Sequence, residues 1–175
     1  MRQIEVQVAH LFVSPLHRYE GRPSDGPVPL PAGGAEGGVA EIALRAHLGV
    51  VGDRYFGREA HRSASVTVMA MESLEAVERE LQVGHALDPF ATRRTVFLRG
   101  ADVDALARTR FSLDTGAGEV VFQGNRPANP CAWMNVALAE GAHRALRGRG
   151  GVRCEPLADG NLTLGPAVLR VYDEP

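Results

Sequence analysis

The chain opens with a segment in which apolar and polar residues alternate, the pattern of a strand with one buried face. In residues 4–13 polar side chains separate Ile4, Val6 and Val8, and such a period of two predicts a half-buried strand. Alternating or β-branched stretches recur along the chain. They cover residues 39–45, 65–70, 95–99, 119–123, 152–157, 162–164 and 168–172. The pattern predicts roughly eight strands.

Residues 71–81 change to a helical period. Their apolar side chains recur every three or four positions, at Met71, Leu74, Val77 and Leu81. Charged residues fill most of the other positions, so the segment predicts an amphipathic helix. The sequence offers two further helices, both short, at residues 102–106 and 141–146.

Short strands separated by glycine and proline turns, with few helices, are typical of a mainly β fold, a barrel or a folded-over sheet. The regular alternation of strands and helices that a doubly wound fold needs is missing. Asp159-Gly160 predicts a hairpin turn between strands 152–157 and 162–164. Residues 14–38 are rich in proline and glycine, and they predict a long, partly mobile loop inside a single domain spanning residues 1–175.

The composition fits one globular domain and argues against several kinds of partner. The chain has 175 residues, 45% of them hydrophobic, which is enough to bury a core. A formal net charge of -2 gives no strong attraction to nucleic acid or anionic membranes, and no apolar run reaches the roughly 18 residues of a membrane span. The first residues lack a signal-peptide core. We therefore predict a cytoplasmic location, where Cys131 and Cys154 are reduced thiols.

All 19 basic residues are arginines, and lysine is absent from the sequence. An enzyme that uses pyridoxal phosphate needs a lysine for its Schiff base, and a Walker-type phosphate loop needs one as well. Both classes are excluded. Any pyridoxal-phosphate chemistry connected with this protein must take place on a partner.

Cys131 is the first candidate for chemistry. It ends the sequence Asn129-Pro130-Cys131, downstream of the predicted strand 119–123. Asparagine near a cap and proline in the first turn resemble the start of a short helix. The positive end of such a helix, together with Arg126, favours a thiolate. The alternative is a small buried hydrophobic residue, which many free cysteines are.

Cys154 makes a useful contrast to Cys131. It lies in the predicted strand 152–157, on the same face as Val152. We predict that Cys154 is a buried, inert thiol.

A turn bracketed by glycines, residues 49–57, carries a second group of candidates. Gly52 permits backbone conformations, or a close ligand approach, that a side chain forbids. Asp53 and Arg54 follow it, and Asp53 either accepts hydrogen bonds from a ligand or caps the turn. His61 comes shortly after the turn, and a lone histidine is more often structural than catalytic.

Arg93 and Arg94 precede the predicted strand 95–99. A guanidinium binds phosphate bidentately, although an exposed arginine pair is usually only solvated. Because neighbouring side chains on a strand point to opposite sides, at most one of the two is expected to face a given pocket. The sequence has no Gly-x-Ser-x-Gly motif and no His/Cys spacing typical of a metal site.

Taken together, these segments resemble the MOSC family, named after the C-terminal domain of molybdenum cofactor sulfurases. The similarity extends over nearly the whole chain. The matching segments are His10–Pro15, residues 49–57 with Gly52-Asp53, His61, Arg93-Arg94, Gly100 and Asn129–Cys131. The sequence departs from the family at Thr95, because the family often has an asparagine after the arginine.

The resemblance implies a mainly β, MOSC-like barrel with a few short helices, in which Cys131 receives sulfur as a persulfide from a separate cysteine desulfurase. We therefore expect a sulfur carrier or sulfurtransferase-type protein for metal–sulfur, molybdenum-related cofactors, with Cys131 as nucleophile and carrier. The expected pocket is concave and friendly to anions. Its candidate residues are Gly52, Asp53, Arg54, His61, Arg93, Arg94, Arg126 and Asn129.

Two alternatives remain open. In relatives that act as reductases the same cysteine binds molybdenum, so the chain is alternatively an oxidoreductase component that holds molybdenum cofactor (molybdopterin) through Cys131. It would then reduce N-hydroxylated compounds with electrons from an electron-transfer protein. The other alternative is a cofactor-binding or storage module without turnover.

Overall fold

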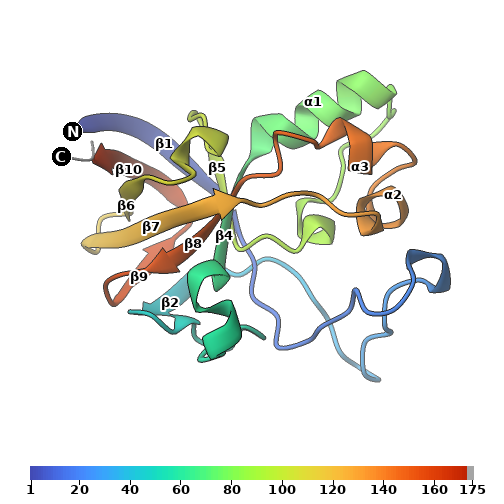
Figure 1. The fold of residues 1–175 in the computed structure, drawn as a ribbon, viewed down its shortest axis with the longest axis horizontal. Coiled ribbons are helices and arrows are strands. Elements are labelled where there is room, and N and C mark those ends of the chain that lie inside the picture. The colour runs from blue at the N-terminus through green and yellow to red at the C-terminus, as the bar shows by residue number, and fades with distance from the viewer. Residues whose placement is uncertain (173–175) are drawn as a thin grey trace.

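A closed seven-stranded β-barrel forms one half of the molecule in the computed structural model, which describes residues 1–172 (Figure 1). The strands run around the barrel in the order β1-β10-β6-β7-β8-β4-β5. Their bounds are β1 Arg2–Leu11, β4 Val66–Ala70, β5 Val96–Arg99, β6 Arg110–Asp114, β7 Glu119–Pro127, β8 Val152–Pro156 and β10 Gly165–Tyr172. The predicted mainly β, barrel-like class is thus confirmed.

Apolar residues at alternate positions along the strands fill the barrel interior. In β1, Val6 and Val8 are buried while their neighbours are more exposed, and the strand pairs with β10 from Arg2 to Val8. Phe111 on β6 and Phe122 on β7 are partners in register, fully buried and stacked with ring centroids 5.3 Å apart. Closure pairs every strand on both sides, which removes exposed edges from the barrel.

A small second sheet lies beside the barrel, with the order β3-β2-β9. It consists of β3 (Gly49–Val50), β2 (Glu41–Arg45) and β9 (Gly160–Thr163). The predicted hairpin at Asp159-Gly160 is wrong, because β9 pairs with β2 whereas β8 pairs with β4 and β7. Asp159 instead accepts a hydrogen bond from the backbone N–H of Ala46 at 2.7 Å, which ties this turn to the end of β2.

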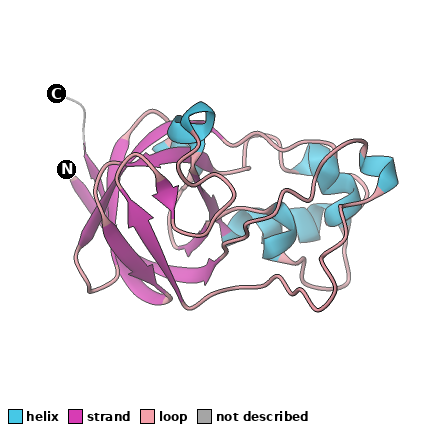
Figure 2. Cartoon of the chain, turned by 90° about the horizontal axis from the view of Figure 1, so that it is seen from below, coloured by secondary structure: helices cyan, strands magenta, loops and turns pink. Residues whose placement is uncertain are grey.

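The α-helices gather at one end of the barrel, called the helical end below (Figure 2). They are α1 (Met71–Leu81), α2 (Trp133–Ala137) and α3 (Ala142–Ala145). The helix α1 connects β4 to β5, which form the parallel pair of the barrel. No helix within residues 1–172 is long and apolar enough to cross a membrane.

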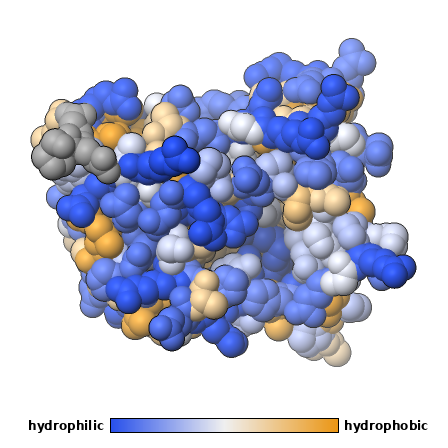
Figure 3. Space-filling model, viewed as in Figure 1, coloured by the Kyte–Doolittle hydropathy of each residue, from blue (hydrophilic) through white to orange (hydrophobic). Residues whose placement is uncertain are grey.

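Helix α1 has the bounds that its periodicity predicts, and its apolar face packs on a second hydrophobic cluster outside the barrel. Leu74 and Val77 are buried there with Phe97, Leu146 and Trp133. The predicted short helix at residues 102–106 is a 3-10 turn, Asp104–Leu106. The surface over this half and the barrel is mostly hydrophilic in the view of Figure 3.

Residues 14–38, called the strap below, run along the helical end of the molecule (Figure 1). Their one regular element is a 3-10 turn, Pro23–Asp25. Glu36 anchors the strap through a hydrogen bond with Ser14 and ion pairs with Arg18 and Arg93, each at 3.0 Å. A second anchor is the stack of Tyr19 on Trp133. The strap therefore has fixed points, and its partial mobility stays a prediction.

Candidate functional site

Cys131 lies on the connection between β7 and α2, and its side chain is exposed. The predicted capping by Asn129 is wrong. The helix begins only at Trp133, has Ala132 at its N-cap position and is five residues long. Pro130 disfavours a helical backbone at Asn129. Cys131 therefore precedes the helix, and its carbonyl accepts a hydrogen bond from the Met134 N–H at 3.0 Å.

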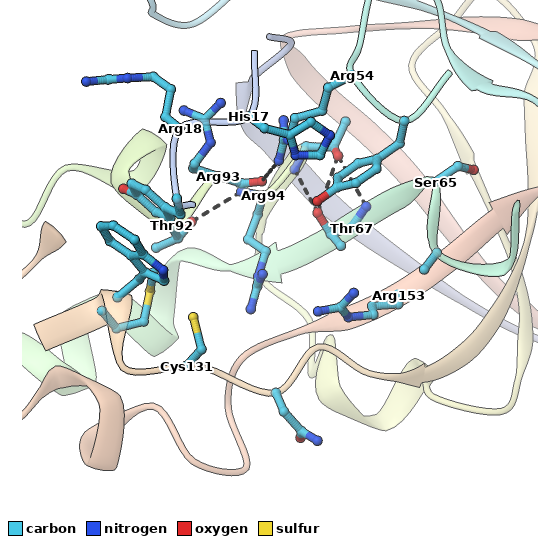
Figure 4. Close-up of a pocket in the computed structure, with 17 residues that line it drawn as sticks. His17, Arg18, Arg54, Ser65, Thr67, Thr92, Arg93, Arg94, Cys131 and Arg153 are labelled. Atoms are coloured by element: carbon cyan, nitrogen blue, oxygen red, sulfur yellow. Dashed lines mark hydrogen bonds between the residues drawn. The ribbon is translucent and has the colours of Figure 1, made fainter. Parts of the chain in front are cut away.

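The thiol faces a pocket of about 220 Å³ between the helical end of the barrel, the strap and the connection that carries Cys131 (Figure 4). Five arginines line the pocket, together with three aromatic rings, those of Tyr19, Tyr55 and Trp133, and several hydroxyl groups. The lining residues are His17, Arg18, Tyr19, Arg54, Tyr55, Ala64, Ser65, Thr67, Thr92, Arg93, Arg94, Thr95, Asn129, Cys131, Trp133, Met134 and Arg153. None of these lining residues carries a carboxylate.

Arg94 is held at the pocket by backbone carbonyls. Its Nε donates to the Gly150 oxygen at 3.2 Å, and its Nη2 donates to the Ala128 oxygen at 2.9 Å. Burial is the main cause that lowers the pKa of Arg94, to about 10, and the positive charge of Arg153 acts in the same direction. The charges of Cys131 and Tyr55 act in the opposite direction. At neutral pH Arg94 therefore stays a cation beside the thiol.

Two neighbouring glycines, Gly150 and Gly151, let the chain pass close to backbone carbonyls of other segments. A Cβ atom at Gly150 would lie 2.2 Å from the Ala128 oxygen, and one at Gly151 would lie 2.1 Å from the Val68 oxygen. Gly151 also has a φ of 89°, a conformation that side chains disfavour. Glycine at position 150 lets the chain approach the Ala128 carbonyl, which holds Arg94, and glycine at position 151 lets the same segment approach Val68 on β4.

We expect Gly150→Ala to destabilise the fold by about 2 kcal/mol or more and to displace Arg94, because the new methyl group must push the Ala128 carbonyl away. Denaturant unfolding and the crystal structure of the variant measure the two effects. The control is Gly84→Ala, since a Cβ there meets no atom within 4 Å and the backbone φ is ordinary. Equal stability of the two variants would contradict the prediction.

Arg93 also lines the pocket, so the expectation that at most one of the two arginines faces it is wrong. The reason is that Arg93 does not lie on a strand. It ends the 3-10 turn Pro89–Thr92 with a φ of 57°, and β5 begins only at Val96. Its guanidinium bonds both oxygens of Glu36 and the Leu16 carbonyl, which joins the pocket to the strap.

The turn of Gly52, Asp53 and Arg54 divides into a structural part and a pocket part. The Asp53 carboxylate accepts hydrogen bonds from the N–H groups of Ser14 and Tyr55, at 3.3 and 3.0 Å, so it caps its own turn and lies outside the lining. Gly52 has a φ of 86° and also lies outside. Arg54 lines the pocket, with its guanidinium 4.6 Å from the centroid of the Tyr55 ring.

Three further candidates divide in the same way. Asn129 lines the pocket. His61 does not, and its ring packs against Tyr55 with centroids 4.7 Å apart. Arg126 does not line it either: its exposed side chain lies on β7 opposite Arg153. The arginines near Cys131 are therefore Arg94 and Arg153 rather than Arg126.

Sequence reasoning did not select Arg153 as a site residue, and it missed the strap residues His17, Arg18 and Tyr19. Arg153 alternates with Val152 and Cys154 on β8, which predicts an outward side chain. The strap residues lie in a loop without any periodic signal. Their common position comes from long-range packing, such as the stacking of Tyr19 on Trp133 at 4.9 Å.

The pocket therefore combines an accessible thiol with fixed positive charge. The carboxylates that pair with lining arginines do not themselves line the pocket, as Glu36 with Arg93 and Asp53 with Arg54 show. Among residues 1–172, His, Cys, Asp and Glu form no group of three or more that could hold a metal ion. The chemistry that fits this arrangement is binding of an anion next to a nucleophilic sulfur.

The protein is thus a closed β-barrel that carries, at its helical end, a pocket lined by one cysteine and five arginines. A MOSC domain is recognised over residues 45–169, and the chain belongs to the MOSC family. A search of curated protein sequences found no match.

Solved structures share the fold. The YUAD protein from Bacillus subtilis has a TM-score of 0.75 and 14% identity, and the match covers 99% of each chain. For YiiM from Escherichia coli the TM-score is 0.62 at 16% identity, over 99% of this chain and 71% of that one. For YiiM from Geobacillus stearothermophilus the values are 0.57 and 15%, over 94% and 75%.

Proposed function

We propose that this protein is a sulfur carrier, a sulfurtransferase-type protein that holds a persulfide on Cys131 for molybdenum-related metal–sulfur cofactor chemistry. The observation that supports the proposal is the exposed thiol of Cys131 in a pocket lined by five arginines and no carboxylate. A persulfide is an anion at neutral pH, and buried guanidinium groups stabilise such a charge. Membership of the MOSC family is consistent with this role.

The loading step is a thiol exchange in which Cys131 is the nucleophile. The Cys131 thiolate attacks the outer sulfur of a persulfide on a cysteine desulfurase, the sulfur–sulfur bond of the donor breaks, and the donor cysteine leaves as a thiolate. Arg94 attracts the negative charge that moves onto the new outer sulfur. Pyridoxal-phosphate chemistry belongs to the desulfurase, because this chain has no lysine. The step requires a reduced thiol, so we propose a cytoplasmic location.

The test is to incubate the reduced protein with a cysteine desulfurase and free cysteine, and to map added sulfur by peptide mass spectrometry. We expect one extra sulfur atom, located on Cys131. Cys154→Ala is the matched control and should load as the wild type does. An extra sulfur on Cys154, or none under conditions that load a known acceptor, would refute the proposal.

The donor set also fits molybdenum cofactor, which is the second candidate. Cys131 offers a sulfur ligand of the kind that binds molybdenum, and Arg94 and Arg153 suit the phosphate of the pterin. When bound, the cofactor would supply two-electron reduction of N-hydroxylated compounds, fed by an electron-transfer partner. The chain's own residues would hold the cofactor in a pocket whose lining contains no carboxylate.

Metal analysis separates the candidates. The protein is purified from a host that makes the cofactor, and its molybdenum and pterin contents are measured beside those of Cys131→Ala. Persulfide without metal supports the sulfur carrier. Stoichiometric molybdenum and pterin that the variant lacks would favour the second candidate, and the same result without turnover of N-hydroxylated substrates would favour a storage module.

A further inference from the structure

The arginines of the pocket differ in how their charges are balanced. Arg18 and Arg93 pair with Glu36, and Arg54 lies 3.3 Å from Asp53. Two arginines have no such partner. Within residues 1–172, the Arg94 guanidinium bonds only to backbone carbonyls, and the side chain of the half-buried Arg153 makes no hydrogen bond or ion pair.

These two guanidinium groups lie close enough to affect each other. The charge of Arg153 is the strongest charge effect on Arg94, after burial itself, and it disfavours the Arg94 cation. The backbone of Arg153 is placed by the register of β8, where the residue is opposite Thr67 of β4. Repulsion between two fixed cations is relieved when an anion binds between them.

Figure 4 shows the Arg94 and Arg153 guanidinium groups and the Cys131 sulfur pointing toward the same space. All three line one pocket of about 220 Å³. A ligand of a few heavy atoms can therefore touch both arginines through its oxygens and present another atom to the thiol. An ion that combines a dianionic oxyanion with a transferable sulfur matches this arrangement of two cations and a thiol.

We propose that Arg94 and Arg153 form a binding site for thiosulfate, which loads Cys131 with sulfur without a partner protein. The proposal rests on the proposed sulfur-carrier function and names a substrate for it. The Cys131 thiolate attacks the outer sulfur of thiosulfate, a new sulfur–sulfur bond forms, and the bond to the sulfonate sulfur breaks. Sulfite leaves with the electron pair, and Cys131 becomes a persulfide. The total charge is unchanged, and no external oxidant or reductant is required.

The test uses the full chain, reduced and freed of reductant, with thiosulfate as the probe. Peptide mass spectrometry measures persulfide on Cys131, and sulfite release measures the rate. We expect one sulfite per Cys131. In Arg153→Gln the rate should fall about ten- to a hundredfold, the factor expected for one lost charge-assisted hydrogen bond. Arg2→Gln, an exposed arginine on β1, should load like the wild type.

Competition identifies the anion. Inorganic phosphate should slow thiosulfate loading of the wild type more than chloride does at equal ionic strength, which separates occupancy of the site from screening. Loading of Arg153→Gln should lose this sensitivity. A phosphate monoester that competes far better than inorganic phosphate would assign the site to a larger ligand and overturn the thiosulfate proposal.

The remaining outcomes separate this proposal from the function on which it rests. Loading by the desulfurase without loading by thiosulfate would overturn the thiosulfate site and leave the sulfur carrier standing. Failure of both donors would overturn both proposals. Unchanged thiosulfate loading in a folded Arg153→Gln would overturn the role of the arginine pair.

Discussion

Replacement of Cys131 by alanine is expected to abolish sulfur loading and alkylation at neutral pH while the free energy of unfolding stays almost unchanged. The exposed Cys131 side chain contributes little to packing, and its sulfur is the nucleophile. Intact-mass measurement of a single alkylation in the native protein checks the reactivity, and denaturant unfolding checks the stability. The expectation fails if the alkyl group or the extra sulfur is found on Cys154.

Cys154 is expected to behave in the opposite way. Its side chain is fully buried in the barrel core, and burial raises the pKa of its thiol far above the usual range. It therefore stays protonated and unreactive in the native state. Cys154→Ala should cost about 1 kcal/mol through a small cavity and leave loading intact.

Glu36→Ala is expected to produce the largest loss of stability, about 3 kcal/mol, because it leaves the buried Arg93 guanidinium without its anion. The Arg93 side chain is only 7% exposed and that of Glu36 only 12%. Loss of this anchor should also release the strap, so limited proteolysis should cut within residues 14–38 sooner than in the wild type. The matched control is Glu20→Ala, since Glu20 lies exposed on the same strap. Equal cleavage rates in the two variants would contradict the role of Glu36.

The same carboxylate predicts an acid-sensitive component of stability. Burial alone would raise the pKa of Glu36, but hydrogen bonds from Arg93, Ser14 and Arg18 outweigh burial and lower it from 4.5 to about 2. A folded pKa below the unfolded value adds stability that is complete above about pH 4.5 and is lost as the pH falls toward 2. Unfolding at pH 7 and pH 3 should therefore show a smaller acid loss in Glu36→Gln than in the wild type.

Local pattern was sufficient for elements whose burial is regular. The period of residues 71–81 predicts α1 with the bounds that the structure has, and the alternation in residues 4–13 predicts β1. The strand β6 was missed because Arg110–Asp114 is short and has only two apolar residues, Phe111 and Leu113. Pairing between distant strands could not be predicted, since the contact of β9 with β2 depends on packing rather than on the turn at Asp159-Gly160.

For the site, too, local sequence predicts some residues, and long-range packing determines the others. Cys131 and Arg94 stand out by their sequence context and by the MOSC resemblance, and the structure brings both to one pocket. Arg153 was not selected from sequence, because an outward side chain on a barrel strand normally meets solvent. Here the strap and the Cys131 connection extend the molecule beyond that face. Sequence left Asp53 as either ligand-binding or turn-capping and placed it among the pocket candidates, whereas its hydrogen bonds show capping.

The stack of Tyr19 on Trp133 gives the molecule a built-in optical reporter. Trp133 is the only tryptophan in the sequence, its ring lies nearly parallel to that of Tyr19, with an interplanar angle of 8°, and it is two residues from Cys131. One fluorophore therefore contacts the strap and the reactive segment at once. Its emission spectrum and quenching by iodide can follow release of the strap and occupation of the pocket in real time, without any added label.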